Sequence, residues 1–135
     1  MTLAWVTGGA GFIGRHLVQH LVSGRARVAG LDLAGPGGLS DAVVGWQTGR
    51  LSAEGMTALA NQVGSPDIIY HLAGGASVGA SLNDPAGDFH ASVVGTAILL
   101  DWLRECSDGY KLSRTTYVTA CMIVTCLTRI AHTRA

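Results

Sequence analysis

Three glycines near the amino terminus constrain the fold of this chain more than any other feature. Gly8, Gly11 and Gly14 follow a short apolar run, residues 3–7, and precede residues 12–22, which carry apolar side chains at helical spacing. The first glycine permits a sharp turn out of a strand, the second lets a ligand approach the backbone, and the third lets a helix pack closely on a sheet. Unpaired N–H groups at the start of such a helix attract negative charge. The pattern therefore predicts a strand, a phosphate-binding loop and a helix in succession.

The rest of the chain continues the alternation of strand and helix. We expect further strands over 27–33, 43–47 and 67–73, helices over 52–63 (capped by Ser52) and 91–106, and loops over 34–41 and 74–87, with a helix start near Asp84 and Pro85. The expected strands are short apolar runs, which is typical of parallel strands covered on both faces. The alternation predicts an α/β fold of the Rossmann type, a doubly wound parallel sheet with right-handed crossovers.

The composition changes near residue 109. Up to that point there are five basic and nine acidic side chains, whereas residues 110–135 hold four basic and no acidic ones, together with six of the eleven threonines. We therefore assign residues 1–108 to a dinucleotide-binding domain and 109–135 to an atypical tail with a candidate fifth strand. On this interpretation the chain is truncated or frameshifted near residue 109, so that the sheet stops after about the fifth strand.

Bulk composition excludes several classes of protein. The net charge is zero and only 13% of the residues are charged, which gives no electrostatic basis for binding nucleic acid or an anionic membrane surface. The apolar stretch 117–127 is too short to span a bilayer, and the amino terminus lacks the basic segment of a signal peptide. An odd number of cysteines without metal-type spacing argues against a disulfide framework and a metal site: Cys106, Cys121 and Cys126. We expect a cytoplasmic protein with reduced thiols.

Asp32 indicates which dinucleotide the glycine loop would take. It lies eighteen residues beyond Gly14, at the end of the second expected strand. A carboxylate there accepts hydrogen bonds from both hydroxyls of an adenosine ribose and repels a 2′-phosphate. Residues 33–38 contain no Arg or Lys to hold such a phosphate, so NAD is favoured over NADP. Arg15 is the one nearby cation; it either reaches a cofactor phosphate or is a solvated residue of the first helical turn.

Residues 7–18, Thr-Gly-Gly-Ala-Gly-Phe-Ile-Gly-Arg-His-Leu-Val, resemble the opening of the extended short-chain dehydrogenase/reductases, and among them most closely the NAD-dependent epimerase/dehydratase family. The resemblance continues at 66–74, 84–85 and 95–100 and covers about residues 2–106. It implies hydride transfer on nucleotide-sugar-type substrates. It also implies cofactor contacts at Gly8, Gly11, Phe12, Ile13, Gly14, Asp32, Leu51, Leu72, Ala73 and Gly74. His71 is expected to be a satisfied strand-end histidine without a chemical role.

The sequence departs from the family pattern at two binding positions. The family commonly has an acid and an apolar residue after its third strand, where the acid binds the adenine amino group, but this chain has Arg50-Leu51. Only Leu51 is therefore carried over. The family usually places Asn three residues before its Gly-Thr pair, whereas this chain has Ser92, a shorter side chain with a different set of hydrogen bonds.

A third departure concerns catalysis. Residues 117–121 resemble the family's fifth strand, but its catalytic hydroxyl position falls on Ala120, and Thr119 serves only if the register slips by one residue. The family's Tyr-x-x-x-Lys, in which Lys lowers the Tyr pKa for proton transfer, occurs nowhere in the chain. We therefore assign no catalytic residue.

Three hypotheses follow for the function. The chain is the NAD-binding portion of an epimerase/dehydratase-like protein and is catalytically incomplete by itself. The alternative is a non-catalytic dinucleotide-sensing module that acts through a protein partner, and a third hypothesis supplies Tyr-x-x-x-Lys from a separate chain. The family's dimers use two helices and the second is missing here, so a dimer is not carried over. The resemblance implies that substrate choice resides mostly in a region of the family that these residues do not include.

Overall fold

The computed structural model describes residues 1–75 and 77–106, and there the expected alternation of strands and helices is confirmed. The strands are β1 (Leu3–Thr7), β2 (Arg27–Asp32), β3 (Gly45–Thr48) and β4 (Ile68–His71). The helices are α1 (Phe12–Ser23), α2 (Ala53–Val63), α3 (Val78–Asn83), α4 (Pro85–Phe89) and α5 (Gly95–Cys106). Two further elements are the 3₁₀ turn η1 (Gly37–Leu39) and the π-helical segment η2 (His90–Val94). The assigned tail, the candidate fifth strand and Thr119 lie outside the described residues.

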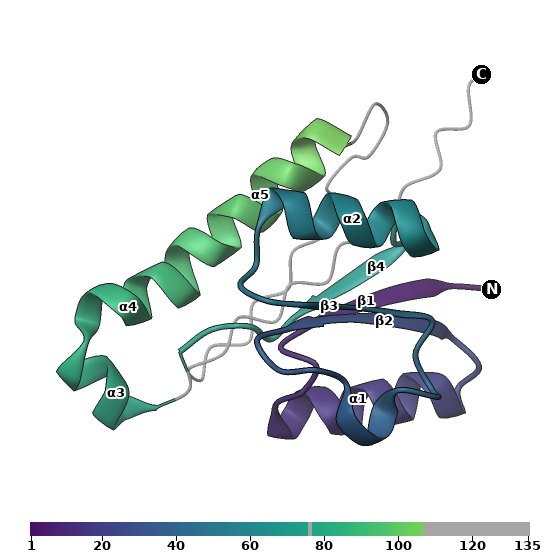
Figure 1. Ribbon diagram of the computed structural model, residues 1–135, viewed down its shortest axis with the longest axis horizontal. Coiled ribbons are helices and arrows are strands. Elements are labelled where there is room, and N and C mark those ends of the chain that lie inside the picture. Colours follow the sequence, from purple (N-terminus) through teal and green to yellow (C-terminus); the bar gives the residue numbers. More distant parts are fainter. Residues whose placement is uncertain (76, 107–135) are drawn as a thin grey trace.

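The sheet has the parallel order β3-β2-β1-β4 (Figure 1). β1 is central, with Trp5 opposite Ala29 of β2 on one side and Ile69 of β4 on the other. The chain builds outward from β1 through β2 to β3 and then crosses back to place β4 beyond β1. Such a reversal of direction leaves a crevice outside the carboxyl ends of the strands. The predicted Rossmann-type fold is confirmed.

Helices cover both faces of the sheet, α2 and α5 on one side and α1 on the other (Figure 1). Alternate residues of β1 serve the two layers, because successive side chains of a strand point to opposite faces. Trp5 packs in the cluster with α2 and α5, and Val6 packs in the cluster with α1. The Trp5 ring stacks on Trp102 of α5 at a centroid distance of 5.5 Å, and the Trp102 indole N–H donates to Thr57 of α2 at 3.0 Å. The two helices are thus tied to each other and to the central strand.

The segment 74–87, predicted as loop, is the main error of the sequence-based assignment. It contains the helix α3, while α4 begins at Pro85 as expected. Helix α3 has six residues and buries none of them, so its sequence lacks the apolar periodicity from which a helix is predicted. Its start depends on a local hydrogen bond, in which the Ser77 hydroxyl accepts from the Ala80 N–H at 3.3 Å. Such a cap satisfies an N–H group that the helix itself leaves unpaired.

Smaller differences concern the ends of elements. Strand β2 ends at Asp32 because Leu33 turns out to solvent, with 68% of its surface exposed. Strand β3 begins two residues and ends one residue later than expected, and β4 is limited to residues 68–71. Helix α2 begins after Ser52, whose hydroxyl accepts from the Gly55 N–H at 3.1 Å, as predicted.

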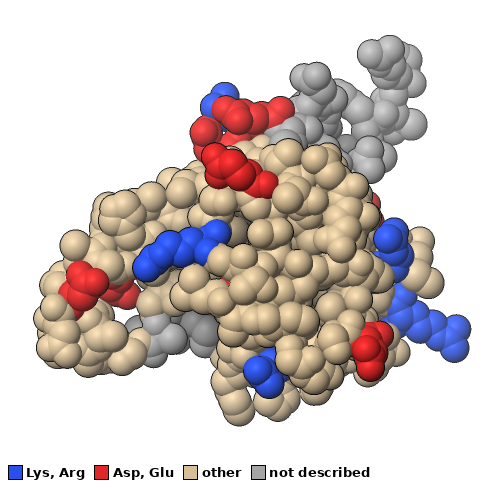
Figure 2. Space-filling model, in the orientation of Figure 1, with Lys and Arg blue, Asp and Glu red and all other residues tan. Residues whose placement is uncertain are grey.

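The surface carries few charges. On the face shown in Figure 2, charged side chains form small groups between broad uncharged areas, and at the top of the view basic and acidic side chains lie together. Within residues 1–75 and 77–106, no helix has the length and apolar character needed to cross a membrane.

Candidate functional site

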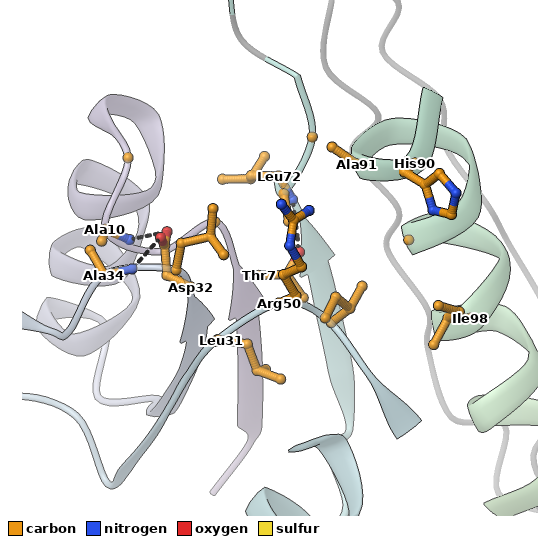
Figure 3. A pocket seen from close by; sticks show the side chains of 18 of the residues that line it. Thr7, Ala10, Leu31, Asp32, Ala34, Arg50, Leu72, His90, Ala91 and Ile98 are labelled. Carbon is orange, nitrogen blue, oxygen red and sulfur yellow. Dashed lines mark hydrogen bonds between the residues drawn. The ribbon is translucent and has the colours of Figure 1, made fainter. Parts of the chain in front are cut away.

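A cavity of about 450 Å³ opens at the carboxyl edge of the sheet, where the strand order reverses between β1 and β4. Its walls come from the ends of β1, β2 and β4, from the loop between β3 and α2, and from η2 and α5. Figure 3 shows Asp32 at one end and the helix that carries Ala91 and Ile98 at the other. This size and place are typical of ligand sites in open α/β sheets.

The glycine loop is packed too closely to admit side chains. Gly8 has φ +72°, and a Cβ there would lie 2.7 Å from the carbonyl carbon of Leu72. A Cβ at Gly14 would lie 2.7 Å from the Cα of Gly9 and inside contact distance of the Gly8 carbonyl oxygen. The loop therefore brings α1 and the end of β4 against each other, and only glycine fits between them. A cradle of this kind exposes backbone rather than side chains to a ligand.

Helix α1 begins with its positive end open. It starts after Gly11, with no side-chain cap and no acidic residue in its first turn, whereas α2, α3 and α4 are capped by Ser52, Ser77 and Asp84. Its first N–H groups and the helix dipole therefore favour an anion at that end. The residues present fit a phosphate group at this position.

Asp32 is held rigidly at the end of β2. One carboxylate oxygen accepts from the Ala10 N–H at 2.9 Å and the other from the Ala34 N–H at 3.1 Å (Figure 3). A carboxylate has about four acceptor positions, so it retains capacity for further donors. The guanidinium of Arg15 donates to the Ala10 carbonyl at 2.8 Å. Hydrogen bonds through Ala10 of the glycine loop thus connect Asp32 with Arg15, the cation that the sequence analysis identified in this region.

His71 and two threonines form a buried polar network behind the cavity. His71 Nδ1 lies 2.6 Å from Thr7 Oγ1, and Nε2 lies 3.0 Å from Thr96 Oγ1. Thr7 Oγ1 also accepts from the N–H groups of Leu72 and Ala73, both at 3.2 Å. Burial lowers the pKa of His71 to about 4, since the charged imidazolium loses its hydration there. The predicted satisfied histidine at the end of the strand is what the structure contains.

Of the two binding positions that depart from the family pattern, Arg50 lines the cavity, whereas Ser92 lies on η2 between the lining residues Ala91 and Val94. Arg50 lines the cavity with an exposed side chain (Figure 3), and within the described residues its guanidinium has no hydrogen-bond or ion-pair partner. Ser92 on η2 accepts from the Gly75 N–H at 3.0 Å. The Arg50 guanidinium is therefore a positively charged donor at the mouth of the cavity. The Ser92 hydroxyl connects the segment after β4 to the opposite wall by a hydrogen bond.

The structure brings together seven of the ten residues expected at a cofactor: Gly8, Gly11, Asp32, Leu51, Leu72, Ala73 and Gly74 line the cavity. Phe12, Ile13 and Gly14 do not line it. Phe12 and Ile13 point outward from the first turn of α1, and Phe12 is 83% exposed. Gly14 lies beneath Gly8, so its role in the structure is packing.

Sequence reasoning missed the wall formed by η2 and α5. Ala91, Val94, Gly95 and Ile98 line the cavity from that side. A spacing of three and four residues in the expected helix 91–106 was the available signal, but the same spacing also describes a helix that packs on a sheet. Within the described residues, no group of three or more His, Cys, Asp or Glu side chains is placed to hold a metal ion.

Comparison with known proteins agrees with this geometry. A model of the NAD dependent epimerase/dehydratase family matches residues 4–125, which is most of the chain. The chain belongs to this family. Two curated relatives are the UDP-glucose 4-epimerase of Mycolicibacterium smegmatis, 36% identical over 107 residues, and the dTDP-glucose 4,6-dehydratase of Escherichia coli, 35% identical over 109 residues. These alignments cover 73% and 74% of this chain but only 34% and 30% of the relatives, so the chain spans about a third of their length.

Solved structures of the family have the same fold. The Thermus thermophilus UDP-glucose 4-epimerase in complex with NAD is 29% identical and superimposes with a TM-score of 0.69, over 84% of this chain and 40% of that one. The epimerase of Bifidobacterium longum, in complex with NAD⁺ and UDP, is 25% identical with a TM-score of 0.69, over 77% of this chain and 34% of that one. The family match reaches residue 125 and therefore includes residues 117–121, which resemble the family's fifth strand.

Proposed function

We propose that this chain binds NAD in the cavity at the carboxyl edge of its sheet and is the cofactor-binding portion of a nucleotide-sugar epimerase or dehydratase. The observation that carries the proposal is the convergence of the glycine loop, Asp32 and residues 72–74 on one cavity at the reversal point of the sheet. Family relatives solved in complex with NAD support the same cofactor for this chain.

Each part of the site has a separate task in this proposal. The Gly8–Gly14 loop and the open end of α1 hold the pyrophosphate through backbone N–H groups. Asp32 accepts hydrogen bonds from the adenosine ribose. Leu72, Ala73 and Gly74 lie beside the cofactor farther along the cavity, and Leu51 gives the base an apolar contact. Phe12 and Ile13 contribute their N–H groups rather than their side chains.

The preference for NAD over NADP depends on the charge at the end of β2. Asp32 repels a 2′-phosphate, and residues 33–38 provide no Arg or Lys to neutralise one. Arg15 is the residue that opposes this preference, because its terminal nitrogen lies 3.7 Å from where a Cβ of Gly37 would stand, beside the loop after β2. Its Nε is occupied by the Ala10 carbonyl. In this proposal the fixed carboxylate at the end of β2 outweighs the exposed guanidinium of Arg15.

The binding test is calorimetric titration of the 135-residue chain with NAD⁺ and NADP⁺. We expect saturable binding of NAD⁺ and much weaker binding of NADP⁺. Asp32→Asn removes the negative charge and one hydrogen-bond acceptor. It is expected to weaken NAD⁺ binding roughly ten- to hundredfold and to reduce the difference in affinity between NAD⁺ and NADP⁺. Asp41→Asn is the matched control, because Asp41 is an exposed acid in the loop after η1 and does not line the cavity. Absence of saturable NAD⁺ binding in a folded sample would overturn the proposal.

We further propose that the chain by itself does not complete the reaction. A bound nicotinamide accepts or returns a hydride in this chemistry. The hydroxyl proton must leave at the same time, and none of the three tyrosines of this chain has a lysine four residues later to form the proton acceptor. Incubation with NAD⁺ and UDP-glucose or dTDP-glucose should therefore yield neither NADH absorbance nor a sugar product. Product that increases in proportion to the amount of protein would contradict this.

The composition supports a cytoplasmic location and argues against nucleic acid as a partner. The first proposal depends on the reduced thiols expected from the number and spacing of the cysteines, and the second depends on the low and balanced charge. Fractionation of cells expressing the tagged chain tests the first, and filter binding with duplex DNA and RNA tests the second.

A further inference from the structure

We propose that His71 is a positioning residue that, in its neutral Nε2–H form, fixes the backbone of residues 72–75 against the opposite wall of the cavity. The proposal rests on the proposed function in one respect, namely that this backbone faces the cofactor. Its geometric part concerns only the residues of this chain.

The direction of each hydrogen bond follows from the donors available. The Thr96 hydroxyl donates to the Ser92 carbonyl at 2.6 Å, so its oxygen is free to accept from His71 Nε2. Nε2 therefore carries the proton. On the other side, Thr7 Oγ1 accepts from backbone N–H groups and has one proton to donate, which goes to the unprotonated Nδ1 at 2.6 Å. One neutral tautomer satisfies every donor and acceptor in this chain of bonds.

The network closes around the segment that follows β4. The Ala73 N–H donates to Thr7 Oγ1 at 3.2 Å, and the Leu72 N–H is shared between that oxygen at 3.2 Å and the Thr7 carbonyl at 3.0 Å. The Gly75 N–H donates to the Ser92 hydroxyl at 3.0 Å. Residues 72–75 are thus held at one end from β1 and at the other end from η2.

His71 links these two attachment points. Its ring touches Thr7 on one side and Thr96 on the other, and Thr96 in turn holds the Ser92 carbonyl. Ala73 and Gly74 line the cavity between the attachments. A shift of either wall therefore changes the position of the backbone that faces the cavity.

Protonation would break this arrangement. A proton on Nδ1 would face Thr7 Oγ1, which would have to turn its own hydrogen away from the ring and accept one bond more. The ring is fully buried, the groups that meet it from β1 and α5 are the two threonine hydroxyls, and within the described residues no charged side chain is bonded to it. Within residues 1–75 and 77–106, no acidic side chain is hydrogen-bonded to the ring to stabilise the imidazolium, in agreement with the lowered pKa of His71.

The first test needs no cofactor. Nitrogen-15 NMR of the imidazoles of the 135-residue chain should show His71 protonated at Nε2 and unprotonated at Nδ1 near neutral pH. Thr96→Val removes the acceptor of Nε2 with little change of volume, and the Nε2 resonance should then move. Thr96→Ser keeps the hydroxyl and should preserve the wild-type resonance. A His71 protonated at Nδ1, or one unaffected by Thr96→Val, would overturn the network.

The second test asks whether the network positions the binding backbone. Thr96→Val should weaken NAD⁺ binding about tenfold, and Thr96→Ser should restore it. Thr57→Val is the matched control, since it removes a threonine hydroxyl that accepts a 3.0 Å bond from Trp102 on the same face but outside the cavity wall. Its NAD⁺ affinity should stay within about twofold of wild type.

The outcomes of the two tests are separable. If the wild-type chain does not bind NAD⁺, the proposed function fails, but the NMR measurement of the His71 tautomer still tests the hydrogen-bond network. If wild type binds and a folded Thr96→Val binds equally well, the positioning role is refuted although the proposed function stands. Should Thr96→Val not fold, the pH profile decides: NAD⁺ affinity of the wild-type chain must fall as His71 takes up its proton, and an affinity that stays constant through that titration refutes the role.

Discussion

Replacement of Gly14 by alanine tests whether the close packing of the glycine loop determines this region of the fold. Gly14 lies in the first turn of α1, where helix propensity alone predicts that alanine stabilises by about 1 kcal/mol. The structure predicts the opposite sign. The added Cβ would lie 2.7 Å from the Gly9 Cα and inside contact distance of the Gly8 carbonyl oxygen, and neither is the end of a flexible side chain.

The magnitude follows from how firmly this backbone is held. The Gly8 N–H donates to the Leu31 carbonyl at 2.8 Å, and the Gly8 carbonyl accepts from the Gly11 N–H at 3.2 Å. Overpacking against such neighbours costs about 1–3 kcal/mol, and the upper part of that range applies when backbone must move. After subtraction of the propensity gain, we expect Gly14→Ala to lower the free energy of unfolding by about 1–2 kcal/mol.

Gly24→Ala is the matched control at the other end of the same helix. Gly24 has φ −77°, and a Cβ there would meet the Leu21 carbonyl oxygen at an ordinary 3.4 Å. Alanine at a compatible position restricts the unfolded chain and stabilises by about 0.4–1 kcal/mol. Urea unfolding followed by far-ultraviolet circular dichroism should therefore move the midpoint down for Gly14→Ala and up for Gly24→Ala. If both variants gain stability, the account of the glycine loop is wrong.

Three further predictions concern other parts of the molecule. Ser52→Ala should lower the free energy of unfolding by about 1 kcal/mol, because it removes the hydroxyl that caps α2. Ser40→Ala, on an exposed turn, should change that free energy by less than about 0.5 kcal/mol. Urea denaturation that finds the two variants equally stable would contradict the role of Ser52 as a cap. Trp102→Ala should cost about 3–5 kcal/mol because it empties the stack on Trp5, and a thermal midpoint near that of wild type would show that the core does not depend on it. Folded His71 keeps its neutral form until about pH 4, while the unfolded chain takes up the proton near 6.5. The free energy of unfolding should therefore fall by about 3 kcal/mol as the pH decreases across that window. His71→Phe should remove this pH dependence, and an unchanged pH dependence in that variant would show that another group causes it.

Local sequence determined most of the elements that build the cavity. Apolar runs of five to seven residues bounded by glycine, proline or acid predict the strands, because a parallel strand buried on both faces needs apolar side chains throughout. The helix starts at Phe12 and after Ser52 follow from glycine spacing and from a capping hydroxyl, both of which act over a few residues. Helix α3 escaped prediction because it buries no residue and so lacks the periodic signal.

Some parts of the candidate site could be predicted from the local sequence, and others depend on the tertiary structure. The glycine loop and Asp32 were evident in the sequence, since their chemistry depends on residue type and on spacing along one βαβ unit. The position of Arg50 beside the cavity followed only from the family resemblance, because its side chain meets that space through the pairing of β2 with β3. The wall formed by Ala91, Val94 and Ile98 likewise depends on how α5 crosses the sheet.

His71 shows most clearly what only the tertiary structure decided. From the sequence it was a histidine at the end of an apolar strand, and its partners could not be named. Thr7 lies 64 residues before it and Thr96 lies 25 residues after it, and the fold places the Thr7 hydroxyl 2.6 Å from Nδ1 and the Thr96 hydroxyl 3.0 Å from Nε2. The residue types that can bond were determined by the sequence; which of them meet depends on strand order and helix packing, since contacts over such separations form only when the whole chain is folded.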